Sequence, residues 1–256
     1  MTREVTALLV FCEGNHEVAF MHRLLRKCLG FGNVPCSFSE YPSPFNQMFK
    51  ENVERHMRSD HTLGSVHSFY LPEKILENGD LIILLFNAGG VPNMPAVGRF
   101  LDEFLEILGE AQTFRIDSWV KKARYLFLYD ADDKGADRLR KQIKKTFATV
   151  GQRPFLTADW RIDASDCGAA TAAEIGVYIW SGEQGLGTIE DVLMPVVRAC
   201  DPSRVDKAEK CVDDLFVWEV DSPKLKRCVS ERASRQKAIM TLLGQKKKPG
   251  SSLNVI

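Results

Sequence analysis

The chain has 256 residues, enough for one large domain or for a domain with an appendage. Basic and acidic residues balance at 34 each, so the overall charge singles out neither nucleic acid nor a membrane surface as a partner. Seven cysteines form no Cys-x-x-Cys pair, the N-terminus has no signal-peptide pattern, and no stretch reaches membrane-spanning length. We therefore expect a soluble, cytoplasmic protein with reduced cysteines and no membrane partner.

The first predicted element is a buried strand that ends in acids. Val5–Cys12 is continuously apolar rather than alternating, which is typical of a strand covered on both faces. Glu13-Gly14 follows directly, and a helix is predicted from about His16. Gly14 allows a tight turn and a close approach to a phosphate. Glu17 lies four residues after Glu13, so both carboxylates can share the helix start, although Glu17 also suits the helix dipole without any ligand.

The next stretch is irregular and leads to a second buried strand. Residues 31–78 contain several prolines, and we interpret them as a helical or irregular insertion or lid, with a short helix at about 45–57. Leu81–Phe86 then predicts a strand that ends in the turn Asn87-Ala88-Gly89-Gly90. Gly89 and Gly90 let the backbone approach a ligand closely, and a helix with an apolar stripe follows.

A third strand, Arg124–Tyr129, runs into Asp130-Ala131-Asp132-Asp133. Alternation along an extended chain places Asp130 and Asp132 on the same side, which suits two ligands of one metal ion or one ligand for each of two. Lys134 comes next and could contact a phosphate. The alternative is a helix-capping cluster without metal. We favour the metal, because three adjacent acids are difficult to place without cations.

The fourth strand, Ile175–Trp180, is followed by a glycine-rich turn and a helix that begins with Thr188, Glu190 and Asp191. Alone, this is an ordinary helix start. Residues 201–256 are predicted to form a helical extension, basic from Ser222 onward, with a mobile tail from Lys246.

Strands and helices alternate through residues 1–200, which predicts an α/β fold with a Rossmann-like core. We expect a four-stranded, mainly parallel sheet flanked by helices, with residues 31–78 inserted after the first helix and residues 201–256 appended. The carboxyl ends of parallel strands meet at one edge of the sheet, where ligands bind. Acids from three strand ends would then gather there, and Mg²⁺ or Mn²⁺ is the cation that hard oxygen ligands prefer.

This order of motifs resembles the Toprim domain, which is shared by topoisomerases, primases and several nucleases. The Glu-Gly-x-x-Glu form, the Gly-Gly turn and the Gly-x-x-Glu-Asp sequence are most similar to its stand-alone, OLD-like branch, over roughly Val5 to Arg198. The resemblance implies that Glu13 acts in acid/base transfer or metal contact and that Asp130 and Asp132 bind metal. It implies a second-metal role for Glu17 and Glu190, and a weaker assignment for Asp191.

The resemblance also implies a function: a metal-dependent phosphodiester hydrolase, a nuclease acting on DNA or RNA. No tyrosine-bearing second domain, zinc motif or Gly-x-x-x-x-Gly-Lys-Ser/Thr loop accompanies the core, so any ATPase that activates it, as in phage defence, would be a separate chain. The alternative is a non-catalytic or regulatory subunit that binds nucleic acid or nucleotide. The sequence leaves open whether the chain forms a homodimer, which nucleic acid it uses, and whether it binds one metal ion or two.

Overall fold

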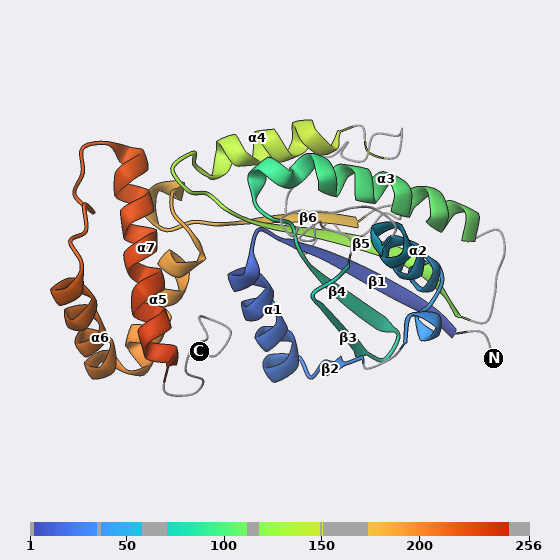
Figure 1. Ribbon diagram of the computed structural model, residues 1–256, viewed down its shortest axis with the longest axis horizontal. Coiled ribbons are helices and arrows are strands. Elements are labelled where there is room, and N and C mark those ends of the chain that lie inside the picture. Colours follow the sequence, from blue (N-terminus) through green and yellow to red (C-terminus); the bar gives the residue numbers. More distant parts are fainter. Residues whose placement is uncertain are drawn as a thin grey trace. The chain divides into compact units, whose positions relative to one another are not determined.

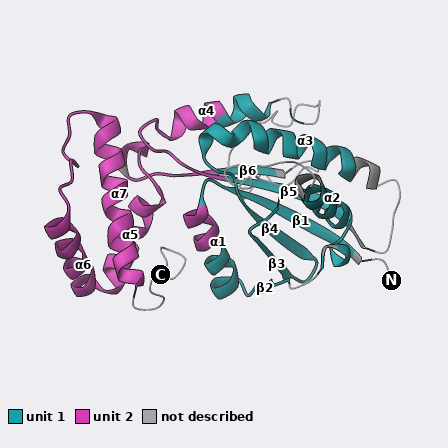
Figure 2. Cartoon of the chain, viewed as in Figure 1, with its two compact units in different colours: residues 1–14, 21–127, 143–177 teal, residues 15–20, 128–142, 178–256 magenta. Residues whose placement is uncertain are grey.

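The computed structural model of the chain describes residues 3–34, 37–57, 71–111, 118–148, 150 and 174–245. It divides into two compact units that interleave along the sequence (Figure 2). The first unit comprises residues 1–14, 21–127 and 143–177, and the second comprises residues 15–20, 128–142 and 178–256.

The strands form one six-stranded sheet in the order β2-β3-β4-β1-β5-β6 (Figure 1). Their bounds are β1 Arg3–Cys12, β2 Gly32–Asn33, β3 Lys74–Asn78, β4 Leu81–Asn87, β5 Ser118–Asp130 and β6 Glu174–Trp180. β1 pairs with β4 in parallel, whereas β3 pairs with both β2 and β4 in antiparallel fashion. The α/β, Rossmann-like prediction is confirmed. The prediction of four mainly parallel strands is wrong, because two further strands make the sheet mixed.

Both additional strands come from the segment that the sequence assigned to an insertion. β2 has only two residues, and β3 carries Lys74 and Glu77 with a single fully buried side chain, Leu76. Neither has the continuous apolar run that marks a strand covered on both faces. Residues 58–70, with His61 and His67, lie outside the described part of the chain.

Aromatic side chains build the core of the first unit. Phe11 on β1 stacks on Phe86 of β4 and on Phe127 of β5, with ring centroids 5.3 and 5.1 Å apart. The ring of Phe100, from helix α3 (Met94–Ala111), meets Phe11 edge-on at 6.3 Å. Helix α2 (Phe45–Met57), which the sequence predicted, joins this core through Phe45. Such contacts explain why β1 is apolar at consecutive positions.

The remaining helices are α1 (Asn15–Cys28), α4 (Ala136–Phe147), α5 (Ile189–Cys200), α6 (Pro202–Leu215) and α7 (Leu225–Gly244). In the second unit, α5, α6 and α7 pack around Met194, Val205, Ile239 and Met240. The helices expected after residue 201 are therefore present, while the predicted tail from Lys246 lies outside the described residues. None of the helices in the described ranges could cross a membrane.

Candidate functional site

In the first unit, the ends of β1 and β4 bring Glu13 and the glycine turn together. The backbone N–H of Gly90 donates to the Glu13 carbonyl (2.9 Å), and the N–H of Ala88 donates to the Cys12 carbonyl (2.7 Å). Gly89 and Gly90 have φ values of +72° and +86°, a region that favours glycine. A Cβ atom at Gly90 would lie only 4.0 Å from Glu13 Oε1. The turn therefore leaves the backbone bare next to this half-buried carboxylate.

In the second unit, the ends of β5 and β6 hold the Asp-x-Asp sequence. Ala131 N–H donates to the carbonyl of Trp180 (2.9 Å). Asp132 and Gly187 then exchange two backbone hydrogen bonds, of 2.8 and 2.9 Å, across an antiparallel bridge. Asp132 has φ of +49°, which is uncommon for a residue other than glycine but is tolerated by Asp and Asn. The glycine-rich turn after β6 thus fixes the backbone that carries the two aspartates.

Asp130 is 7% exposed and points at the start of α5. Its Oδ1 atom accepts a hydrogen bond of 2.8 Å from the backbone N–H of Ile189, the first residue of that helix. A carboxylate is stabilised there by the free N–H groups and the positive end of the helix dipole. Asp130 therefore links the end of β5 to the helix that carries Glu190.

Glu190 is completely buried. His16 Nδ1 lies 2.8 Å from Glu190 Oε1, and Lys237 Nζ lies 3.9 Å from the same oxygen. Burial raises the pKa of Glu190, but the hydrogen bond from His16, the charge of Lys237 and smaller contributions from the Thr188 side chain and the Glu190 backbone N–H lower it by more, so the pKa lies below its ordinary value. Glu190 is therefore ionised at neutral pH. Its other oxygen, Oε2, has no hydrogen-bond partner within the described part of the chain.

The pKa of the half-buried Asp132 is raised instead of lowered. Burial raises its pKa, the negative charges of Asp133 and Glu190 add to the increase, and Lys134 and Lys237 oppose it. A neighbouring negative charge disfavours the ionised form of a carboxyl group. Asp132 and Glu190 therefore share an electrostatic environment with an excess of negative charge, which a bound cation would relieve.

Both carboxylate oxygens of Asp191, next to Glu190, instead have protein groups as partners. Its Oδ2 accepts the backbone N–H of Thr188 (2.9 Å), as expected of an acid in the first turn of a helix. Its Oδ1 lies 2.9 Å from Arg232 Nε and accepts a bond of 3.1 Å from Gln236 Nε2. Asp191 therefore fastens α5 to α7, which gives it a structural role.

The structure places the other predicted residues as follows. Glu17 is buried in the first turn of α1, directly after His16, and Lys134 is exposed beside the aspartates. Glu13, Gly14, Gly89 and Gly90 belong to the first unit, whereas Glu17, Asp130, Asp132, Lys134 and Glu190 belong to the second. In the described part of the chain, no group of three or more His, Cys, Asp or Glu side chains is arranged to hold a metal ion.

The sequence did not predict two residues of the site, His16 and Lys237. His16 lies inside the Glu13–Glu17 motif, so its position was a usable signal. Lys237 was only one of many basic residues after Ser222, and nothing in the sequence singles it out.

These features define an α/β protein with buried and half-buried carboxylates at the ends of its strands. No protein-family model matches the chain, and no curated protein matches it. Among solved structures, it is similar to a hypothetical protein from Pyrococcus horikoshii OT3, with 14% sequence identity and a TM-score of 0.44, over 98% of this chain and 85% of that one. This similarity is too low to support an inference about function.

Proposed function

We propose that the protein is a metal-dependent phosphodiester hydrolase, a nuclease of Toprim-like type acting on DNA or RNA. The observation that carries the proposal is Glu190: a buried, ionised carboxylate with one oxygen lacking any hydrogen-bond partner in the described residues. His16 and Lys237 stabilise the negative charge of Glu190, and Oε2 is the carboxylate oxygen that remains open to a cation.

Mg²⁺ or Mn²⁺ fits this donor set, because its members are hard carboxylate oxygens. In the second unit the ligands would be Asp130, Asp132 and Glu190, with Glu17 as a further candidate, while Glu13, in the first unit, is proposed for acid/base transfer or metal contact. Such an ion polarises a phosphoryl oxygen and lowers the pKa of bound water. Since the described carboxylates do not converge as a ready-made ligand set, the proposal requires some of them to reorient around the ion.

The protein's own groups would prepare metal and phosphate binding in three ways, two of them in the second unit and one in the first. His16 holds Glu190 Oε1 and so fixes the direction of the other oxygen. The exposed Lys134 and the half-exposed Lys237 contribute positive charge near Asp132, where a phosphate would otherwise meet only acids. The Gly89-Gly90 turn exposes backbone next to Glu13, which allows a phosphate to come close to that carboxylate.

A second candidate is a non-catalytic or regulatory subunit. It would bind nucleic acid or nucleotide and would act with a separate ATPase chain. Fold alone does not distinguish the two candidates.

The test is incubation of the purified chain with plasmid, single-stranded DNA and total RNA, with Mg²⁺, Mn²⁺ or EDTA. Three proteins are compared: wild type, Glu13→Gln and a control, Glu106→Gln, which makes the same change at an exposed position on α3. The nuclease proposal requires cleavage that depends on metal, persists in Glu106→Gln and is lost in Glu13→Gln. Equal cleavage by Glu13→Gln would reject it. Absence of cleavage by wild type, with retained metal or nucleic-acid binding by calorimetry, would favour the regulatory subunit.

A further inference from the structure

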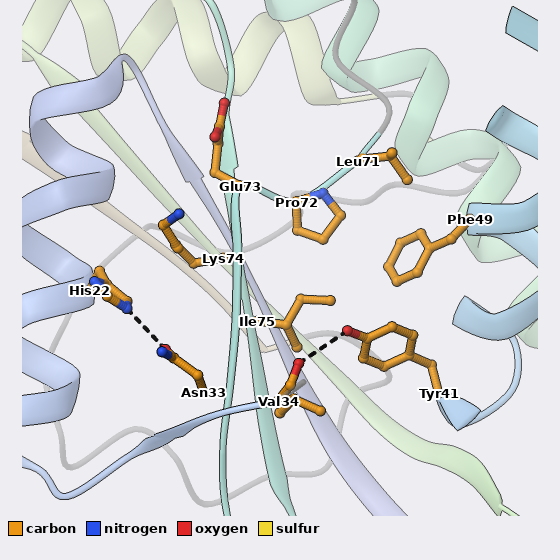
Figure 3. A pocket seen from close by; sticks show the side chains of 10 residues that line it. All are labelled: His22, Asn33, Val34, Tyr41, Phe49, Leu71, Pro72, Glu73, Lys74 and Ile75. Atoms are coloured by element: carbon orange, nitrogen blue, oxygen red, sulfur yellow. Dashed lines mark hydrogen bonds between the residues drawn. The ribbon is translucent and has the colours of Figure 1, made fainter. Parts of the chain in front are cut away.

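A cleft of about 440 Å³ lies in the first unit, where β3 meets α1, β2 and α2 (Figure 3). Its lining shares no residue with the acidic site. The volume falls within the range of pockets that take small organic ligands, roughly 300–1,000 Å³. The cleft therefore has room for a ligand the size of a nucleotide or smaller.

The two sides of the cleft differ in chemistry. Figure 3 shows His22, Asn33 and Lys74 on one side of β3, and Ile75, Tyr41 and Phe49 on the other. On the apolar side, Tyr41 and Phe49 meet edge to face with ring centroids 5.6 Å apart. Their rings offer a preformed surface against which a flat or apolar group can pack.

The side chains of both halves are held in place by hydrogen bonds. His22 Nε2 donates to Asn33 Oδ1 (3.0 Å), which joins α1 to β2. The Tyr41 hydroxyl donates to the carbonyl of Val34 (3.4 Å), which holds its ring over the apolar side. A lining fixed in this way loses little conformational freedom when a ligand binds.

Lys74 gives the polar half a positive charge. It is exposed on β3, and the structure shows no ion pair between it and any acid of the described residues. Glu73 also lines the cleft, and Figure 3 shows it above Lys74, with its carboxylate directed toward the top of the view. The ammonium group is thus the charge that faces a ligand on this side, and it would bind an anionic group.

We propose that this cleft is a second binding site, for a small organic anion whose phosphate or carboxylate lies at Lys74 and whose flat or apolar body packs against Tyr41, Phe49 and Ile75. A mononucleotide and an aromatic carboxylate both have this chemistry. The proposal does not rest on the nuclease function, because it depends on different residues.

The test is calorimetric titration of the full chain with AMP, with 2-naphthoate and with adenosine, which lacks the charge of AMP. EDTA is present, so that no divalent metal ion recruits AMP to the acidic residues. The variants are Lys74→Glu for the polar half, the exposed Leu71→Ser for the apolar half, and Lys27→Glu as a matched charge reversal at an exposed position on α1. Asp132→Asn tests the acidic site.

We expect saturable binding of at least one anion at one site per chain. Lys74→Glu should weaken it by about tenfold or more, since one charge-assisted hydrogen bond is lost, while leaving the weak binding of adenosine unchanged. Leu71→Ser should weaken the anion and adenosine alike, whereas Lys27→Glu and Asp132→Asn should bind as wild type. The preferred anion identifies the ligand as nucleotide or carboxylate. No saturable binding of either anion at millimolar concentration, or equal losses in Lys74→Glu and Lys27→Glu, would overturn the proposal.

Discussion

Replacing Glu190 by glutamine separates two properties of this buried side chain, its hydrogen bond with His16 and its negative charge. The glutamine keeps an oxygen that can accept the hydrogen bond of His16, and it removes the negative charge. The metal-free variant should therefore fold. If the unsatisfied Oε2 atom is a metal ligand, however, the variant should lose the stabilisation that Mn²⁺ or Mg²⁺ gives to the wild type.

The size of that stabilisation follows from mass action. A ligand that binds only the folded state contributes about 2.7 kcal/mol when its concentration is about 100 times its Kd. For a protein of this size, 1 kcal/mol shifts Tm by about 2–4 °C. Saturating Mn²⁺ should therefore raise the Tm of the wild type by about 5–11 °C, and the shift should fall close to zero in Glu190→Gln.

The assay is thermal unfolding, followed by circular dichroism in EDTA and in a series of Mn²⁺ concentrations. Glu106→Gln, at an exposed position, should show the full shift and so controls for nonspecific binding of the ion. An equal Mn²⁺-dependent shift in wild type and Glu190→Gln, with both proteins folded in EDTA, would refute the assignment of Glu190 as a ligand. No shift in the wild type would refute metal binding at this site altogether.

Three further results are expected. Asp132→Asn should raise the Tm of the metal-free protein at neutral pH, because it removes a negative charge that burial and Asp133 disfavour. The unfolding free energy of Asp132→Ala should be about 1 kcal/mol lower than that of Asp132→Asn, because Ala tolerates the φ of +49° poorly. Denaturant unfolding in EDTA measures both. Gly187→Ala should destabilise strongly, because its Cβ would overlap Asp191 and its φ of +105° is strained; a Tm equal to that of the wild type would contradict the close approach of Gly187 to Asp191. Since the folded-state pKa of Glu190 is lowered, the stability that its ionisation contributes is complete above the unfolded value of 4.5 and is lost as pH falls through the lower folded pKa. The difference in unfolding free energy between wild type and Glu190→Gln should therefore change only in the acid range.

The central strands β1 and β4 could be predicted because most of their side chains are buried, and Phe11 shows the reason, with aromatic contacts to β4, β5 and α3. β5 and β6 contain the other two predicted apolar runs, although β5 begins earlier, at Ser118, and β6 is an edge strand on which Tyr178 is exposed. β2 and β3 could not be predicted in the same way. β3 pairs with the two-residue β2 only through Leu76 and Glu77 and is only partly covered, so Lys74 and Glu77 are tolerated, and its pairing depends on β4 rather than on its own pattern.

Only those site residues that belong to a local sequence pattern near the end of a strand could be predicted. Asp130 and Asp132 were found because they come directly after an apolar strand, and Glu190 was found because its helix start follows the fourth strand and resembles a Toprim motif. The His16–Glu190 contact joins positions 174 residues apart, and the approach of Lys237 to Glu190 depends on the packing of α7 in the second unit. Neither contact leaves a local pattern, because periodicity reports burial and not the identity of the neighbour.

Glu190 and Asp191 show how two adjacent acids in one motif acquire different roles. Both lie in the first turn of α5, and the helix dipole favours both equally. Asp191 is satisfied by Thr188, Arg232 and Gln236, so a metal ion would have to displace protein donors to bind it. Glu190 is more deeply buried, yet one oxygen has no hydrogen-bond partner within the described chain. Since a metal ion at Glu190 Oε2 would displace no protein donor in the described residues, Glu190 is the acid of this pair that we expect to bind the ion.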